Sequence, residues 1–439
     1  MLERAGGAAG PKLGSVQHDT LGNARDARPS FPWPAASATG IGSMPGTDPA
    51  EAMRIIAGEL PDFPYLPELP ARGPGADLTG RTAALLVDIP VETTPGGWRI
   101  AERPGRYMRA ARSMLSADLD ALEEVMSGYA GPLKISLCGP WTLSATIELP
   151  RRLDAVLADS GAVADLTASL AEAAAAHVAE VAKRVPAARL VVQFDEPALA
   201  AVAGGEVPTA SGLSRLPAVD AAVVADRLAV VLAAAGRYTV VHCCATPAPF
   251  GIIMTAQPAG IAFDLSLLRR EQMDDVAEAA EAGIGILAGA VPSGPAENPG
   301  ERASRRGAAP PGLRSEERAT REGGAAKRPG GERGGRAGAG RAAPGVTSSP
   351  RRPSPRGREG NGREGSRGRP DEPADTAERV LRFWRLLGMA PDRCAEQVVI
   401  TPSCGLAGAS PAAAVATLAH CREAARIVPE LAEEMEDRA

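Results

Sequence analysis

An imidazole and two thiols follow a short apolar stretch near the middle of the chain, in the order Val240-Val241-His242-Cys243-Cys244. The β-branched residues before them predict a buried strand that ends at this point. Side chains two apart on a strand lie on the same side, so His242 and Cys244 can share one ion. Nitrogen and sulfur are donors that zinc accepts tetrahedrally. The alternative is a buried histidine with two buried thiols and no metal, because free cysteine is often buried.

A third thiol follows a second apolar stretch in the same way. Residues Val398 to Ile400 predict another strand, and Cys404 stands shortly after its end. Two strands that are far apart in the sequence would then each deliver sulfur at the carboxyl end. The carboxyl ends of parallel strands converge at one face of a barrel, so a shared zinc site is expected there.

The composition limits the class of protein. Of the 439 residues, 44% are hydrophobic but only 3% are aromatic, so the core must consist mainly of Ala, Val, Leu and Ile. No apolar run of about 18 residues is present, and a membrane span is therefore not expected. The N-terminal region has no hydrophobic signal core, and the six cysteines form no disulfide framework. Reduced thiols and a cytoplasmic location are expected.

Two segments, 1–37 and 293–370, are poor in large apolar residues and are predicted to be disordered. Between 301 and 370 there are 18 Lys and Arg against 7 Asp and Glu, although the whole chain carries a net charge of −5. An acidic body with one basic insert is not typical of a nucleic-acid-binding fold, so nucleic acid is not an expected partner. We interpret the insert as a tolerated surface extension, with a tether for acidic partners or nucleic acid as the alternative.

Outside these segments, predicted strands alternate with predicted helices. The eight strands are expected near 39–44, 64–69, 133–138, 190–195, 239–243, 261–264, 284–291 and 398–402. Such alternation predicts a parallel sheet, and eight units predict a (β/α)8 TIM barrel. Strands 1–7 would occupy 38–292, and strand 8 with the last helices would occupy 371–430. A doubly wound open sheet is the alternative, but no glycine-rich phosphate turn follows the first strand.

Polar side chains recur where these strands end, which would place them on one face of the barrel. They are Ser43, Glu68, Asp195, Glu196, His242, Cys244, Asp264 and Cys404. Any single acid among them could instead cap a helix. Their recurrence at strand ends favours a site.

Taken together, these segments resemble the C-terminal catalytic barrel of cobalamin-independent methionine synthase, in its single-barrel, archaeal-type form. The matching words, in the family's order, are Ile41-Gly42-Ser43, Gly139-Pro140, Gln193-Phe194-Asp195-Glu196-Pro197-Ala198-Leu199, His242-x-Cys244 and Pro402-x-Cys404-Gly405-Leu406. The resemblance covers about 38 to 430 without the insert. It implies a barrel of the methionine synthase and uroporphyrinogen decarboxylase type. It also implies an activity like that of 5-methyltetrahydropteroyltriglutamate–homocysteine S-methyltransferase in methionine biosynthesis.

The resemblance implies roles for individual residues. The family holds Zn2+ with a His, two Cys and a Glu, which correspond here to His242, Cys244, Cys404 and, in place of the Glu, Asp264. Cys243 is the alternative fourth ligand. The homocysteine-binding positions fall on Ile41, Ser43, Glu68 and Asp195, and we add Glu196 beside them. Zinc would stabilise the substrate thiolate, which then attacks the methyl group of the donor.

One departure concerns the methyl donor. The folate-using enzymes carry a histidine after strand seven, where this chain has Val291-Pro292-Ser293-Gly294. A methylcobalamin-type donor is therefore considered beside methylfolate, since its leaving group needs no proton. Two other hypotheses stay open: a catalytically impaired homocysteine-binding relative, and a related barrel enzyme that acts on another thiol or a porphyrin-like substrate.

Overall fold

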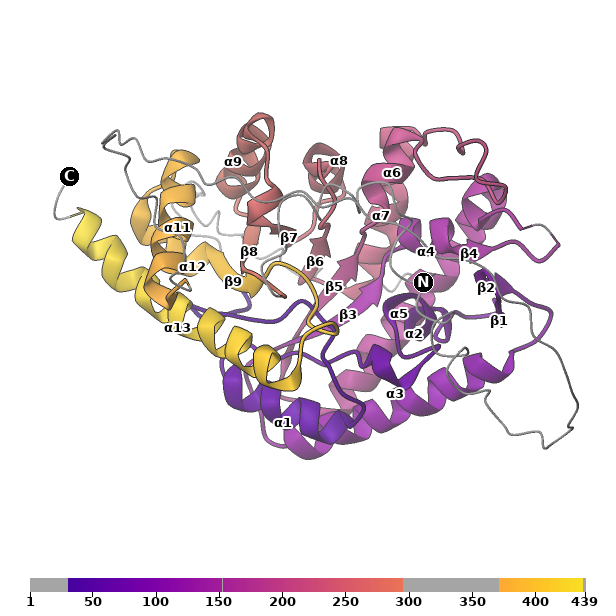
Figure 1. Ribbon diagram of the computed structural model, residues 1–439, viewed down its shortest axis with the longest axis horizontal. Helices are drawn as coiled ribbons and strands as arrows, with labels where there is room; N and C mark the ends of the chain where they lie inside the picture. The colour runs from indigo at the N-terminus through magenta and orange to yellow at the C-terminus, as the bar shows by residue number, and fades with distance from the viewer. Residues whose placement is uncertain (1–30, 152, 295–370, 437–439) are drawn as a thin grey trace, which may run out of the picture.

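The computed structural model of the chain describes residues 31–151, 153–294 and 371–436 (Figure 1). Most of the two segments predicted to be disordered, 1–30 of the first and 295–370 of the second, lie outside the described residues. Among the helices that are described, none combines the length and the apolar character needed to cross a membrane.

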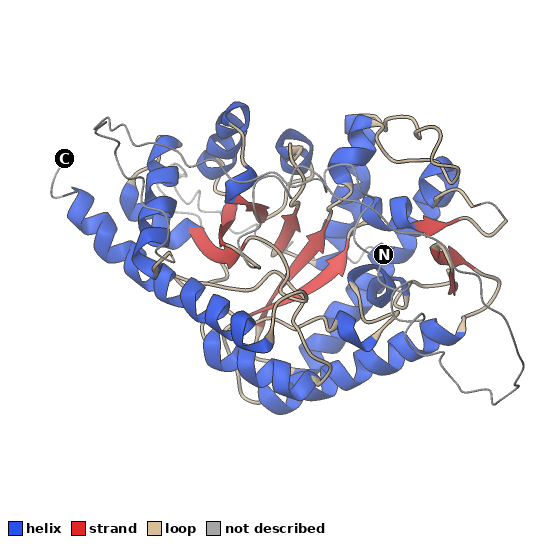
Figure 2. Cartoon of the chain, viewed as in Figure 1, coloured by secondary structure: helices blue, strands red, loops and turns tan. Residues whose placement is uncertain are grey.

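Six parallel strands form a curled sheet, and Figure 2 shows them in the middle of the molecule with helices around them. In spatial order they are β3 (Pro132–Cys138), β5 (Arg189–Asp195), β6 (Thr239–His242), β7 (Gly260–Asp264), β8 (Gly285–Val291) and β9 (Val398–Pro402). Nearly all their residues are buried, as in a parallel sheet covered on both faces. The predicted α/β class and parallel sheet are confirmed, and six of the eight predicted strands lie in this sheet.

The first two predicted strands, 39–44 and 64–69, are extended segments that pair only through isolated bridges. The parallel bridges join Ala38 to Ile400 of β9, Ser43 to Glu68, and Tyr65 to Lys134 of β3. The two segments therefore lie between the edge strands β9 and β3. Close packing accompanies this arrangement, because a Cβ on Gly40 would collide with the ring of Tyr65.

Helices connect the strands and cover the sheet. The longer ones are α1 (Pro49–Glu59), α3 (Arg106–Val125), α5 (Ser160–Arg184), α7 (Ala221–Ala235), α9 (Met273–Glu281), α11 (Pro373–Leu386) and α13 (Pro411–Glu436). The shorter ones are α2 (Leu78–Ala83), α4 (Pro140–Thr146), α6 (Leu199–Gly204), α8 (Phe250–Thr255), α12 (Cys394–Gln397) and the 3-10 turns η1 (Pro70–Arg72), η2 (Val156–Ala158), η3 (Leu265–Leu267), η4 (Arg270–Gln272) and η6 (Pro391–Arg393). Aspartates cap α1, α2, α5 and α7 by accepting bonds from free backbone N–H groups.

A separate three-stranded sheet lies beside the main one. It consists of β1 (Val91–Thr94), β2 (Gly97–Ile100) and β4 (Ile147–Glu148), with β1 and β2 forming an antiparallel hairpin. The hairpin packs against α3 through β1, and β2 pairs with β4, which directly follows α4.

A layer of apolar side chains fills the interior near the amino ends of the strands. Its members are Trp33, Phe63, Val191, Val240, Ala262, Leu287 and Val399. Trp33 is 5% exposed and stacks between Phe31 and Phe63, with ring centroids 5.3 and 5.7 Å away. Residues 31–37 belong to the N-terminal segment predicted to be disordered, yet Trp33 is part of this layer because its ring fills space between the strands.

Candidate functional site

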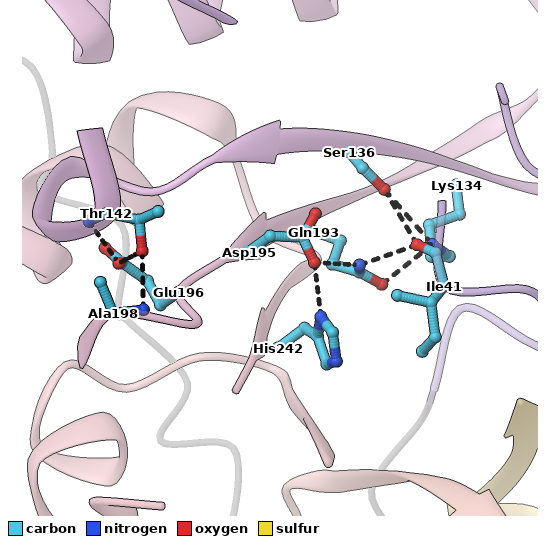
Figure 3. A network of polar contacts seen from close by, with 9 residues as sticks. All are labelled: Ile41, Lys134, Ser136, Thr142, Gln193, Asp195, Glu196, Ala198 and His242. Carbon is cyan, nitrogen blue, oxygen red and sulfur yellow. Dashed lines mark hydrogen bonds and ion pairs between the residues drawn. The ribbon is translucent and has the colours of Figure 1, made fainter. Parts of the chain in front are cut away.

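His242 is held by a carboxylate on the neighbouring strand. Asp195 at the end of β5 lies directly opposite His242 at the end of β6, and His242 Nδ1 is 2.6 Å from Asp195 Oδ1. Because an ionised carboxylate only accepts, Nδ1 carries the proton of this bond. His242 Nε2 is buried and has no hydrogen-bond partner among the described residues. Figure 3 shows the imidazole pointing to Asp195 through its Nδ1 edge.

Two opposing effects act on the pKa of His242. Burial alone lowers it, because the charged imidazolium is poorly solvated there. The hydrogen bond and the negative charge of Asp195, together with the charge of Cys404, outweigh burial and raise the pKa above its ordinary value. The same carboxylate that orients the ring therefore also makes it a better base.

The two predicted thiol ligands contact each other. Cys244 follows β6 and is half-buried, and Cys404 follows β9 and is exposed. A hydrogen bond between their side chains lowers the pKa of Cys404 and raises the pKa of Cys244. His242 lowers the pKa of Cys404 further. The structure thus brings the three predicted donors into one neighbourhood and favours the thiolate on Cys404.

The donor set suits zinc in its chemistry, although it is not assembled as a finished metal cluster. Over residues 31–151, 153–294 and 371–436, no three His, Cys, Asp or Glu side chains are already grouped as they would be around an ion. An unpartnered imidazole nitrogen and a pair of adjacent thiols are nevertheless the atoms that zinc uses. A carboxylate on the far nitrogen is also the usual partner of a metal-bound histidine.

The two candidates for a fourth ligand have other contacts. Asp264 is half-buried at the end of β7, and its Oδ1 accepts bonds from Ser266 N (2.8 Å) and Ser266 Oγ (2.6 Å), which begin η3. Cys243 points into the apolar core, and burial raises its pKa to about 12. That Asp264 is a metal ligand stays a prediction, and no observed contact directs either side chain to the donors.

Glu68 is a buried carboxyl with a free oxygen. Its backbone bridges to Ser43, and its side chain is buried. Burial raises its pKa to about 8, Arg81 lowers it, and Asp195 raises it. Within the part of the chain that the structure describes, Glu68 Oε1 has no hydrogen-bond partner. An unsatisfied buried oxygen of this kind is ready to accept a donor from a ligand.

Ser43 connects the first extended segment to the loop that carries Cys404. Its carbonyl accepts from Leu406 N at 2.8 Å, and its Oγ accepts from Ala407 N at 3.4 Å. The loop can approach because position 405 is glycine, where a Cβ would collide with Ser43 Oγ. Ile41, the other predicted residue of this segment, is buried. In the structure both residues contact protein groups, and their substrate contacts stay predictions.

Glu196 has a different place from its neighbour Asp195. Its carboxylate accepts from Trp141 N (2.9 Å), Thr142 N (2.8 Å) and Thr142 Oγ1 (2.7 Å) at the start of α4. Figure 3 shows the two side chains turned to opposite sides, Asp195 to His242 and Glu196 to Thr142. Glu196, which we predicted to bind substrate, therefore fixes α4 in this structure.

Lys134 and Gln193 are the site residues that the sequence analysis missed. Both are fully buried, and Gln193 Nε2 donates to Asp195 Oδ1 at 2.7 Å while Lys134 Nζ donates to Gln193 Oε1 at 2.9 Å. The signal was available, because a lysine within an otherwise apolar strand and a glutamine two residues before Asp195 both need buried partners.

No family model and no curated protein matches the chain. Among solved structures, the chain is similar to a B12-independent methionine synthase from Shewanella sp. W3-18-1, which was solved in complex with selenomethionine. The two share 11% identity, and the match covers 90% of this chain and 98% of that chain with a TM-score of 0.49. At this level of likeness the function has to be argued from the side chains of this chain.

Proposed function

We propose that the protein is a zinc-dependent methyltransferase that moves a methyl group to the thiol of homocysteine. The observation that supports this most directly is the pairing of His242 with Asp195, which leaves a buried, unpartnered Nε2 near the hydrogen-bonded thiols of Cys244 and Cys404. We also propose that the sheet and the two bridged segments together form the (β/α)8 barrel that the sequence predicts.

His242, Cys244 and Cys404 would hold the metal, with the fourth position left to the substrate sulfur, as in catalytic zinc sites. Zinc, when bound, supplies the positive charge that keeps the substrate thiol ionised at neutral pH. Asp195 keeps the proton of the imidazole on Nδ1 and so keeps Nε2 available. The substrate thiolate then forms its S–C bond to the methyl group as the bond between that methyl and the donor breaks.

Glu68 would bind the ammonium group of homocysteine. Its Oε1 lacks a partner in the described part of the chain, and a carboxylate–ammonium hydrogen bond is charge-assisted. Since burial raises the pKa of Glu68 to about 8, binding of the ammonium has to draw off the proton of this carboxyl. The affinity for homocysteine should therefore increase as the pH rises toward 8.

The methyl donor is proposed to be of the methylcobalamin type. A tertiary amine such as methylfolate needs a proton on its leaving nitrogen, and the described histidines other than His242 are engaged elsewhere. His177 is buried with a pKa lowered to about 3 by burial, and His420 Nε2 lies 2.9 Å from Thr376 Oγ1. A corrinoid leaving group needs no such proton donor.

The proposal is tested by metal analysis and by methyl transfer to homocysteine from methylcobalamin and, separately, from methyltetrahydrofolate. We expect about one zinc per chain, methionine formed from methylcobalamin, and loss of the metal in Cys404→Ala. Cys394→Ala is the matched control, because Cys394 is a buried thiol on α12 outside the site. Zinc-loaded protein that forms no methionine from either donor would refute the proposal.

A homocysteine-binding protein without turnover is the second candidate. It is favoured by the grouping of the side chains, because no three His, Cys, Asp or Glu of the described residues are arranged as around an ion. Calorimetry that detects homocysteine binding to a protein without methyl transfer from either donor would support it.

A further inference from the structure

A lysine ammonium lies inside the sheet, one strand away from Asp195. Lys134 on β3 has no exposed surface, and its Nζ donates to Ile41 O at 2.7 Å, to Gln193 Oε1 at 2.9 Å and to Ser136 Oγ at 3.4 Å. It also lies 5.3 Å from the centre of the Tyr65 ring. An ammonium can only donate, so Gln193 must present its oxygen to Lys134.

The orientation of the Gln193 amide follows from its neighbours. Its Nε2 donates to Ile41 O at 2.8 Å and to Asp195 Oδ1 at 2.7 Å. A flipped amide would place its oxygen against these two acceptors and its NH2 group against the Lys134 ammonium. Only the observed orientation satisfies all three contacts, so the ammonium determines that Asp195 receives an N–H group from Gln193.

The hydrogen bonds to Asp195 also determine which nitrogen of the imidazole carries the proton. Asp195 Oδ1 accepts from Gln193 Nε2 at 2.7 Å and lies 2.6 Å from His242 Nδ1 (Figure 3). An oxygen that receives two N–H groups in a dry interior stays an acceptor, so the proton of the second contact belongs to Nδ1.

We infer that Lys134 and Gln193 are positioning residues that fix, through Asp195, the proton of His242 on Nδ1 and so leave Nε2 free for a ligand. That this ligand is zinc rests on the proposed function. The inference about the proton does not, because every contact in the chain Lys134–Gln193–Asp195–His242 joins two protein groups.

Lys134 also reaches the thiol side of the site. The Ile41 carbonyl accepts from Lys134 and Gln193, and Ser43, two residues on, bonds the loop of Cys404 through Leu406 N. One buried cation therefore contacts both β5, whose Asp195 holds the imidazole, and the extended segment that bonds the loop of Cys404. Second-sphere partners of this kind orient the ligands of a metal site.

Removing this cation costs contacts that the fold uses. Burial lowers the pKa of Lys134 to about 8, although Asp195 and Glu68 raise it. Lys134→Met removes all three donated bonds and leaves Ile41 O and Gln193 Oε1 buried without this donor, so a loss of stability is expected. Gln193→Met, which breaks the same chain at its next link, is therefore measured beside it, and both variants are compared as folded proteins.

The test measures solvent exchange of the His242 imidazole proton by NMR in metal-free protein labelled with 15N at histidine. The signal is assigned by its loss in His242→Gln. Lys134→Met and Gln193→Met should each accelerate its exchange at least about tenfold, since the carboxylate acceptor loses its fixed position. Tyr65→Phe is the matched control, because it changes a neighbour of Lys134 whose hydroxyl has no partner among the described residues. Circular dichroism and thermal unfolding verify that each variant is folded.

Zinc affinity is the second measurement, and we expect it to fall roughly 10- to 100-fold in both methionine variants but not in Tyr65→Phe. Unchanged proton exchange in folded Lys134→Met and Gln193→Met overturns the inference, whether or not the protein binds zinc. Accelerated exchange in a protein whose wild type binds no zinc supports the inference and refutes the proposed function instead.

Discussion

Two buried glutamates, Glu196 and Glu68, have opposite surroundings. Glu196 accepts three hydrogen bonds from Trp141 and Thr142, whereas Glu68 Oε1 has no partner in the described chain. Burial raises the pKa of both, to about 7 for Glu196 and about 8 for Glu68. A carboxyl whose oxygens are used by the protein stabilises the fold, and one with a free oxygen is available to a ligand. Burial alone does not distinguish these two roles.

The largest effect should come from removing the satisfied carboxylate. Glu196→Ala leaves two backbone N–H groups and the Thr142 hydroxyl buried without their acceptor. At roughly 1–3 kcal/mol for each unsatisfied group, we expect a loss of about 3–5 kcal/mol in the free energy of unfolding. Urea denaturation measures this loss. Glu196→Gln, which keeps one acceptor oxygen, should lose less, and equal losses in the two variants would contradict the argument.

Removing the unsatisfied carboxylate should change binding rather than stability. In Glu68→Ala we expect the affinity for homocysteine to fall about 30- to 100-fold, which corresponds to roughly 2–3 kcal/mol for a lost charge-assisted bond. At pH 5, where this carboxyl is protonated in the folded protein, its unfolding free energy should change less than that of Glu196→Ala, because no observed acceptor role of Oε1 is lost. Calorimetry and urea denaturation separate the two quantities. A large loss of stability with intact binding would reverse the roles assigned to the two glutamates.

The dependence of stability on pH tests the raised pKa of Glu68 directly. The pKa of Glu68 is raised from 4.5 to about 8 by folding, so the folded protein binds this proton more tightly. The stabilisation is fully present below pH 4.5 and is lost as the pH rises through 8. Glu68→Gln has no such proton, so its Tm relative to wild type should rise between pH 5 and pH 8.5 in metal-free protein. Parallel Tm curves for the two proteins would exclude the raised pKa.

The smallest effect is expected at Asp264. Asparagine keeps an oxygen that can accept from Ser266 N and Oγ, so Asp264→Asn should preserve the start of η3. If the carboxylate of Asp264, like that of Glu196, only bonds protein groups, the substitution should change the zinc content and the zinc affinity by less than about twofold. This is the size of effect that most surface substitutions have. A loss of zinc would instead establish Asp264 as the fourth ligand that the sequence predicts.

The strands of the sheet could be predicted because each is a short, mostly apolar run. β3, β5, β6, β7, β8 and β9 lie within one or two residues of their predicted bounds. The segments 39–44 and 64–69 were predicted as strands, but glycine and proline in them leave only isolated bridges. The short helices α4, α6 and α8 were missed, since six or seven residues carry too little periodicity to be recognised.

Within the site, the sequence could suggest donors but not their partners. His242, Cys244 and Cys404 were predicted as donors because strand ends converge, and electrostatic interactions link them in the structure, while their role as metal ligands stays a proposal. The separate roles of Asp195 and Glu196 could not be predicted, because adjacent acids at a strand end can turn either way once the strand has ended. Buried lysine and glutamine partners depend on the register of β3 with β5, which a single sequence does not give.

The apolar layer that contains Trp33 matters for anyone who shortens this protein for expression. A fragment that begins at residue 38 would lack Trp33. Its neighbours in the layer, among them Phe63, Val191, Val240 and Leu287, would then be exposed to water at the amino ends of the strands. Such a fragment should be prone to aggregation, whereas a fragment that begins at residue 31 keeps Trp33 stacked between Phe31 and Phe63.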